Sequence, residues 1–207
     1  MYHLKRGQKI ADVPKKTEEL NCFHNSLTSL EGISTLHNLQ ALRCHGNSLA
    51  SLKEISTLHN LQTLNCSYSL TSLEGISTLH NLQILYCSHN SLTSLEGIST
   101  LHNLRTLWCS YNSLTSLEGI STLHNLQILY CTSNVLQSFK HIPENVKFFG
   151  VKNNPIEYSY RTGGSSEKIH EPSGTPKFLK LLESTSDPMS YVKFMRKENL
   201  LKLYLFF

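Results

Sequence analysis

The chain has 207 residues, of which 39% are hydrophobic and 16% charged, and its net charge is +4 at pH 7. This length suits one domain with a short appendage, and the composition excludes a wholly disordered chain because enough apolar residues are present for a core. The basic residues gather near the two ends. The nearly neutral middle therefore lacks the long basic stripe that nucleic-acid binding requires, and we expect no nucleic-acid partner.

Residues 1–16 are basic but no apolar run follows them, so they do not read as a secretory signal. No stretch approaches the roughly 18–20 apolar residues of a membrane-spanning helix, and the apolar run at residues 200–207 is far too short. We expect residues 1–16 to form an N-terminal cap and the chain not to insert into membranes.

Residues 17–157 form a tandem repeat. The phrase SLTSLEGISTLHNL stands at residues 26–39, 69–82, 91–104 and 113–126, with a divergent copy at 48–61. The period is 22 residues with one step of 21. Each unit reads L-x-x-L-x-C-x-x-N-x-L, as in Leu82, Leu85, Cys87, Asn90 and Leu92. With weaker units at both ends, about seven units result, and such self-similarity predicts a solenoid.

This pattern resembles the leucine-rich-repeat family. The tail S-L-E-G-I-x-x-L-H-N-L is similar to the 22-residue, SDS22-like class, whose members regulate phosphatases. The resemblance implies an α/β leucine-rich-repeat solenoid, with a curved parallel sheet on its concave side and short 3-10 turns or loops on its convex side. Because a fold hosts many functions, the resemblance specifies the fold more strongly than the function.

The fourth and sixth positions of each unit alternate with polar ones, which predicts a half-buried strand with these two side chains inward. All six cysteines occupy the sixth position: Cys22, Cys44, Cys66, Cys87, Cys109 and Cys131. We interpret them as small core residues, although neighbouring strands would bring them close enough for bridging under oxidising conditions. Free thiols favour a reducing, intracellular location, which means the cytoplasm or the nucleus.

Asparagines at the ninth position (Asn25, Asn47, Asn90, Asn112, Asn134 and Asn154) predict a ladder of amides that satisfies backbone groups where the chain leaves the sheet. The 21-residue unit lacks this asparagine, because the chain reads Ser67-Tyr68-Ser69 between Cys66 and Leu70. We predict a local defect there, with backbone groups left to water or to Ser69.

Two more columns raise the question of chemistry. Histidines precede the strands at His37, His59, His80, His102 and His124, and glutamates recur at Glu31, Glu74, Glu96 and Glu118. A stacked row of imidazoles could hold zinc, but no thiolate or carboxylate converges on it, so we expect turn residues and no metal. The sequence has no G-x-S-x-G, phosphate loop or paired acids above a cleft, so we expect no cofactor and no enzyme.

The units differ mainly at positions that face the concave side. The fifth position reads Arg43, Asn65, Tyr86, Trp108 and Tyr130 along successive units, so three large rings would stand side by side. We predict a protein-binding face made of Tyr86, Trp108, Tyr130, Ile84, Ile128, Arg43, Tyr111 and His89, because exposed rings on a rigid surface are typical of interface hot spots. The alternative is that the rings only stabilise the sheet through cross-strand pairs.

Residues 158–176 have a linker composition, and residues 177–207 predict a helical segment, because Thr175-Pro176 and Asp187-Pro188 each place a capping side chain before a first-turn proline. This segment would cap the open end of the solenoid, or dock into a partner or a second copy of the chain.

The sequence therefore predicts a protein-interaction module, a scaffold or adaptor, that binds a protein or peptide. An SDS22-like regulatory subunit of a phosphatase and an expanded repeat array without a dedicated partner are the two alternatives.

Overall fold

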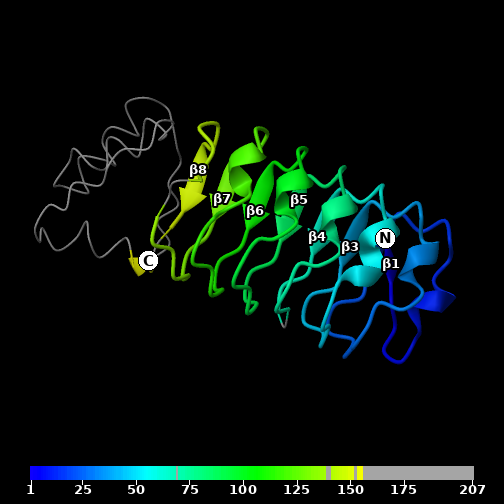
Figure 1. Ribbon diagram of the computed structural model, residues 1–207. Helices are drawn as coiled ribbons and strands as arrows, with labels where there is room; N and C mark the ends of the chain where they lie inside the picture. Colours follow the sequence, from blue (N-terminus) through cyan, green and yellow to red (C-terminus); the bar gives the residue numbers. More distant parts are fainter. Residues whose placement is uncertain (69, 139–140, 152, 156–207) are drawn as a thin grey trace, which may run out of the picture.

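The computed structural model describes residues 1–155 except 69, 139–140 and 152. These residues form one parallel sheet in which the order of the eight strands is their order along the chain (Figure 1). The strands are β1 (Tyr2–His3), β2 (Glu19–Asn21), β3 (Ala41–Arg43), β4 (Thr63–Asn65), β5 (Ile84–Tyr86), β6 (Thr106–Trp108), β7 (Ile128–Tyr130) and β8 (Phe148–Gly150).

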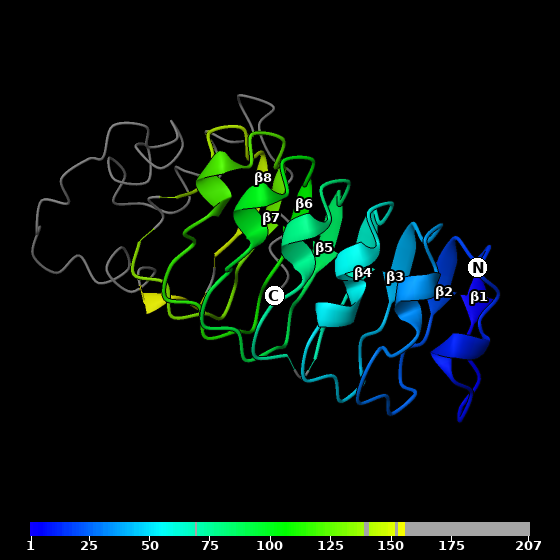
Figure 2. The ribbon, with the colours of Figure 1, turned by 45° about the vertical axis from the view of Figure 1, so that its right-hand side comes forward.

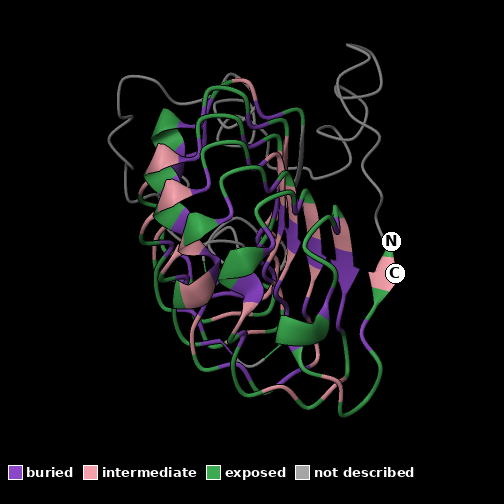
Figure 3. Ribbon diagram, turned by 90° about the vertical axis from the view of Figure 1, so that its right-hand side faces the viewer, coloured by how far each residue is buried: buried purple, intermediate pink, exposed green. Residues whose placement is uncertain are grey.

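Short 3-10 helices lie on the other side of the core from the sheet (Figures 2 and 3). They are η1 (Ile10–Asp12), η2 (Ile33–Thr35), η3 (Lys53–Thr57), η4 (Ile76–Thr78), η5 (Ile98–Thr100) and η6 (Ile120–Thr122). Each unit from β1 to β6 is thus a strand, a turn, a 3-10 helix and a return to the next strand. The parallel sheet and the 3-10 turns predicted from the repeat are confirmed.

The two-residue alternation of the strands determines which side chains are buried. Leu85 pairs with Leu107 and Leu107 with Leu129, so the fourth position of each unit stacks on the same position of the next. These leucines are fully buried, together with the leucines and isoleucines of the return segments. Burying one such side chain contributes about 1.5–3 kcal/mol, and the core that they form is continuous along the array.

The cysteines point inward, as predicted. All six are buried and free. Burial raises the pKa of Cys22, Cys66 and Cys109 to about 12, because a thiolate would lose its hydration in the core. Burial also raises the pKa of Cys44, Cys87 and Cys131 well above the ordinary value, and neighbouring cysteines add to the rise. The column is therefore a row of unreactive core thiols.

The predicted asparagine ladder is confirmed. In the unit of Asn112, the side-chain amide donates to the carbonyls of Cys87 and Cys109 at 3.1 and 3.0 Å, and its carbonyl accepts from the backbone N–H of Leu92 at 3.0 Å. One side chain thus joins two adjacent units. The amides are buried or half-buried, so each bond satisfies a backbone group that has limited access to water.

The ladder is interrupted where the sequence predicts it. The Leu49 N–H corresponds to the Leu92 N–H, but no asparagine side chain among the described residues accepts its proton. Leu49 is 3% exposed, so water has little access to this side chain. Ser69, which we considered as a substitute acceptor, lies outside the described residues.

The S-T-L-H-N phrase joins neighbouring units on the outside. The Asn81 and Asn103 side-chain amides donate to the carbonyls of His59 and His80, one unit earlier, at 2.9 and 2.8 Å. Threonine hydroxyls also connect neighbouring units: Thr100 Oγ1 donates to the Ser77 carbonyl at 2.7 Å. The histidine rings are exposed, and some lie close to the backbone of the next unit. His80 Nδ1, for example, lies 3.4 Å from the Thr100 carbonyl. In the described part of the chain, no cluster of three or more His, Cys, Asp or Glu could hold a metal.

The turns before η2, η4, η5 and η6 depend on glycine. Gly32, Gly75, Gly97 and Gly119 have φ between 84° and 104°, in the left-handed region. Glu54 stands at the equivalent position of the divergent unit and does not adopt positive φ. Because this residue keeps a right-handed backbone, helix η3 begins earlier and has five residues where the regular units have three.

The predicted N-terminal cap, residues 1–16, adds a strand and a helix. Strand β1 pairs with β2, and Leu4, Ile10 and Val13 are buried in the common core. No helix of the described residues combines the length and the apolarity needed to span a bilayer. The predicted linker and C-terminal helical segment, 158–176 and 177–207, lie outside the described residues.

Candidate functional site

Three large rings stand side by side on the exposed side of the sheet, which we call the sheet face. Tyr86, Trp108 and Tyr130 are register partners on β5, β6 and β7. The Tyr86 and Trp108 ring centroids lie 5.5 Å apart at 66° between planes, and those of Trp108 and Tyr130 lie 4.8 Å apart at 51°. Trp108 is 41% exposed, whereas Tyr86 and Tyr130 are half-buried. We call these three residues the ring row.

The isoleucines predicted to flank the rings lie on the same face. Ile84 and Ile128 are both half-buried, and Thr106 on the strand between them is the register partner of each. They form an apolar border on the side of the ring row where the strands begin.

A second group of rings lies where the chain turns away after the strands. Tyr68, His89 and Tyr111 occupy the eighth position of successive units, and we call them the ring stack. Their planes are nearly parallel, with centroids 5.1 Å apart between Tyr68 and His89 and 4.4 Å between His89 and Tyr111. All three have positive φ, between 55° and 73°, which is uncommon for bulky side chains and costs about 1–2 kcal/mol per residue.

Small hydroxyl residues separate the two groups of rings. Ser67, Ser88 and Ser110 hold the seventh position, between the fifth and eighth positions along the chain, and they point outward because the cysteine before each points inward. Ser67 and Ser110 are only 8% and 9% exposed, so the larger rings on both sides cover them. The ring row thus lies on β5–β7, whereas the ring stack follows β4–β6, so the two groups are offset by one unit along the array.

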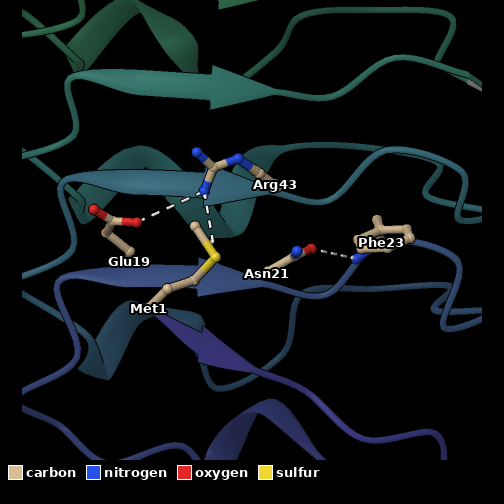
Figure 4. Close-up of polar contacts among 5 residues, drawn as sticks. All are labelled: Met1, Glu19, Asn21, Phe23 and Arg43. Carbon is tan, nitrogen blue, oxygen red and sulfur yellow. Dashed lines mark hydrogen bonds and ion pairs between the residues drawn. The ribbon is translucent and has the colours of Figure 1, made fainter.

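Arg43 is set apart from the ring row. It lies on β3, and Asn65 on β4 is the register partner between it and Tyr86. Its guanidinium Nη1 lies 3.7 Å from a Glu19 carboxylate oxygen and 3.8 Å from the Met1 sulfur (Figure 4). Of the predicted site residues, the structure thus brings seven together and leaves Arg43 at the N-terminal end of the face.

A ring cluster at this N-terminal end was not predicted. Phe23 stacks on His45 with centroids 5.2 Å apart, and His24 meets both rings edge-on. His45 Nδ1 is buried and has no partner in the described part of the chain. The pKa of His45 is lowered, mainly because burial disfavours the charged ring and secondarily because His24 and Arg43 are nearby. Phe23 and His45 hold the seventh position of adjacent units, so the alignment of the repeats contained this pair.

Two shallow hollows lie away from the rings, on the loops that lead into the 3-10 helices. The larger, about 640 Å³, is lined by hydroxyl residues and by Glu96, Glu118 and His141, and the smaller, about 380 Å³, includes Glu74 and Glu96. Glu74, Glu96 and Glu118 of the glutamate column thus line shallow hollows on a loop surface. Ser116 Oγ accepts the Glu118 backbone N–H at 3.0 Å, which explains the recurrence of serine two residues before the glutamate.

The sheet, the leucine core and the asparagine ladder together define a leucine-rich-repeat solenoid. The family described as Leucine Rich repeats (2 copies) matches residues 59–100 and 102–144, so these residues are leucine-rich repeats by sequence as well as by structure. Repeats of this family generally mediate protein–protein interaction and typically serve as non-enzymatic scaffolds. No functionally curated protein matches the chain.

Solved structures of bacterial leucine-rich-repeat proteins are similar to this chain. A leucine-rich-repeat protein of Leptospira interrogans is 32% identical with a TM-score of 0.63, over 68% of this chain and 38% of that one. Two internalins of Listeria monocytogenes, inlF and inlC2, are 20% and 22% identical, with TM-scores of 0.61 and 0.57. They are matched over 66% of this chain and over 48% and 72% of their own lengths. The chain spans less than half of the Leptospira protein and of inlF.

Proposed function

We propose that the chain is a protein-interaction module, a scaffold or adaptor, that binds a protein or peptide on its sheet face. The observation that carries this proposal is the ring row on β5–β7, where three rings stand side by side on a parallel sheet and Trp108 is 41% exposed. Tyrosine and tryptophan supply contact area with little loss of side-chain entropy, and such residues dominate the energetics of protein interfaces.

The surroundings of the ring row support this reading. Ile84 and Ile128 add apolar area beside the rings. The scaffold does not require these rings, because the neighbouring units carry Arg43 and Asn65 at the same outward position. A sheet-stabilising role alone would not require Trp108 to remain 41% exposed.

Affinity capture from a cell extract tests the proposal. Trp108→Ala should weaken capture of the specific partner by about 2 kcal/mol or more while the solenoid stays folded, because the indole is not part of the core. Phe23→Ala is the matched control, since Phe23 is 42% exposed but lies at the other end of the face. If both variants capture the same proteins as the unaltered chain, the ring row is not a binding site.

The same experiment separates the two other functions considered for this sequence. An SDS22-like regulator would capture a phosphatase catalytic subunit, whereas an expanded array without a dedicated partner would capture nothing in a Trp108-dependent way. The proposal also places the chain in a reducing, intracellular compartment, the cytoplasm or the nucleus. The six free thiols support this placement because they lie in one column of adjacent strands.

A further inference from the structure

The sheet face over β5–β7 offers hydrogen-bond donors and almost no charge. The outward residues of β4 to β7 are Thr63, Asn65, Ile84, Tyr86, Thr106, Trp108, Ile128 and Tyr130, none of which is charged at neutral pH. Arg105, which precedes β6, is the nearest charged residue along the strands that carry the ring row, and its guanidinium only donates hydrogen bonds. The ligand that complements this face is uncharged and rich in acceptors.

The donors on this face are free. Among the described residues, no hydrogen bond uses the Tyr86 or Tyr130 hydroxyls or the Trp108 indole N–H. The rings cover Ser67 and Ser110, and Ser88 Oγ is buried without a partner in the described part of the chain, so these hydroxyls are not open to a ligand. A ligand that covered the two tyrosine hydroxyls and the indole N–H without supplying hydrogen-bond partners would leave them unsatisfied, at a cost in affinity.

A helical peptide suits the indole N–H and the arginine poorly, because a helix uses most of its backbone carbonyls internally. A polyproline II segment keeps all its carbonyls free, and proline offers no N–H that would need an acceptor. Its pyrrolidine rings are flat and apolar, and such segments dock into aromatic-lined grooves.

The spacing of the rings fits the same segment. Polyproline II advances about 3.1 Å per residue, so one turn of three residues spans about 9.3 Å. Neighbouring strands lie about 4.8 Å apart, so Tyr86 and Tyr130, two strands apart, are separated by about 9.6 Å along the array. Prolines three residues apart would therefore meet these two tyrosines, with Trp108 under the turn between them.

We propose that the ring row binds an uncharged, proline-rich peptide in the polyproline II conformation, which lies along the array across Tyr86, Trp108 and Tyr130. This inference rests on the proposed function and names the chemistry of the partner. The inclined rings of the ring row receive the prolines.

Trp108 is the single tryptophan of the chain, so its fluorescence reports directly on ligand binding at the ring row. The probe is a synthetic peptide of about twelve residues with proline at every third position. It should shift the Trp108 emission saturably. An alanine-based helical peptide, a cello-oligosaccharide and an oligothymidylate of similar length should not. A peptide of the same composition with its prolines gathered at one end should bind more weakly.

Variants are compared by the anisotropy of the fluorescently labelled peptide. Trp108→Ala should weaken binding about tenfold or more, and Tyr130→Phe, which removes one hydroxyl of the ring row, should weaken it about fivefold. Trp108→Phe keeps a ring but loses the N–H donor and should fall between Trp108→Ala and the unaltered chain. Phe23→Ala should leave binding unchanged. Circular dichroism establishes that each variant is folded.

The inference is overturned if the proline peptide gives no saturable shift, if the helical peptide binds equally well, or if Trp108→Ala binds normally. Competition distinguishes this failure from failure of the proposed function. When Trp108→Ala loses the captured proteins but the proline peptide does not displace them from the unaltered chain, the function stands and the partner chemistry is wrong. When Trp108→Ala loses none of them, both proposals fail.

Discussion

The same substitution should have different costs at two rungs of the asparagine ladder, Asn47 and Asn112. The Asn47 amide donates to the carbonyls of Cys22 and Cys44, both at 2.9 Å, and its carbonyl accepts from the backbone N–H groups of Asn25 and Leu27 at 3.0 and 2.9 Å. Within the described residues neither cysteine carbonyl has another donor. The unit after Asn47 lacks its asparagine, and the Asn25 amide donates elsewhere.

Asn112 lies in the regular part of the ladder. The carbonyls of Cys87 and Cys109 each receive a second amide, from the asparagine of an adjacent unit or of the same unit, at 2.9 and 3.1 Å. Removing the Asn112 side chain therefore leaves only the Leu92 N–H without its partner. Because one unpartnered buried group costs about 1–3 kcal/mol, we expect Asn112→Leu to cost about 1–2 kcal/mol.

Asn47→Leu removes the partner from four groups. Taking the low end of the range for each, because Asn25 and Leu27 are only half-buried, the expected cost is about 4 kcal/mol. Urea unfolding followed by circular dichroism measures both variants against the unaltered chain, and the comparison requires equal slopes in the denaturant dependence. Equal midpoints for the two variants, or a lower midpoint for Asn112→Leu, would refute the idea that adjacent rungs share their carbonyls.

Three more predictions follow from other parts of the array. Gly75→Ala should destabilise the chain by about 3 kcal/mol and Gly97→Ala by only about 1 kcal/mol in thermal unfolding. Both glycines have positive φ, but a Cβ at Gly75 would lie 2.4 Å from the Leu52 carbonyl oxygen, whereas the nearest atom to a Cβ at Gly97 is 3.6 Å away. The pKa of His45 is lowered in the folded chain from 6.5, so the unfolded chain binds more protons just below that pH. Stability should hold above pH 6.5 and decline as the pH falls below it, and His45→Gln should flatten this decline in urea unfolding. The raised pKa values of the buried thiols predict that iodoacetamide leaves all six cysteines unmodified in the native chain and modifies all six in denaturant. Mass spectrometry measures the modification. Modification of Cys87 or Cys109 in the folded chain would contradict their place in the core.

The repeat made the scaffold predictable because each unit reports the same geometry again. The inward leucines, the cysteine column, the asparagine ladder and its gap all follow from position within the unit, and the structure confirms each of them. The length of helix η3 was harder to predict from the sequence. Sequence alignment reveals Glu54 at a glycine position, but the change from three to five helical residues depends on which backbone conformation the glutamate can adopt.

The candidate site was predictable only in part. Alternation along the strand placed Tyr86, Trp108 and Tyr130 outward and in register, and this part is a matter of the repeat alone. The repeat alone does not predict the angles between the rings, because these depend on side-chain rotamers that neighbouring units determine jointly. No sequence pattern therefore distinguished the inclined ring row from the parallel ring stack.

The residues around Trp108 differ from their neighbours in a compensating way. Strands β5 and β7 both read Ile-Leu-Tyr, whereas β6 between them reads Thr-Leu-Trp. The wider indole thus occurs together with the smaller Thr106 at the adjacent outward position, so the two outward residues of each strand keep a similar combined bulk. Copying of the unit alone would repeat one outward pair, as it repeats the cysteine. The alternation instead leaves Trp108 open between two tyrosines, and an indole in this position is the arrangement that a binding groove needs and that a self-packed sheet surface does not.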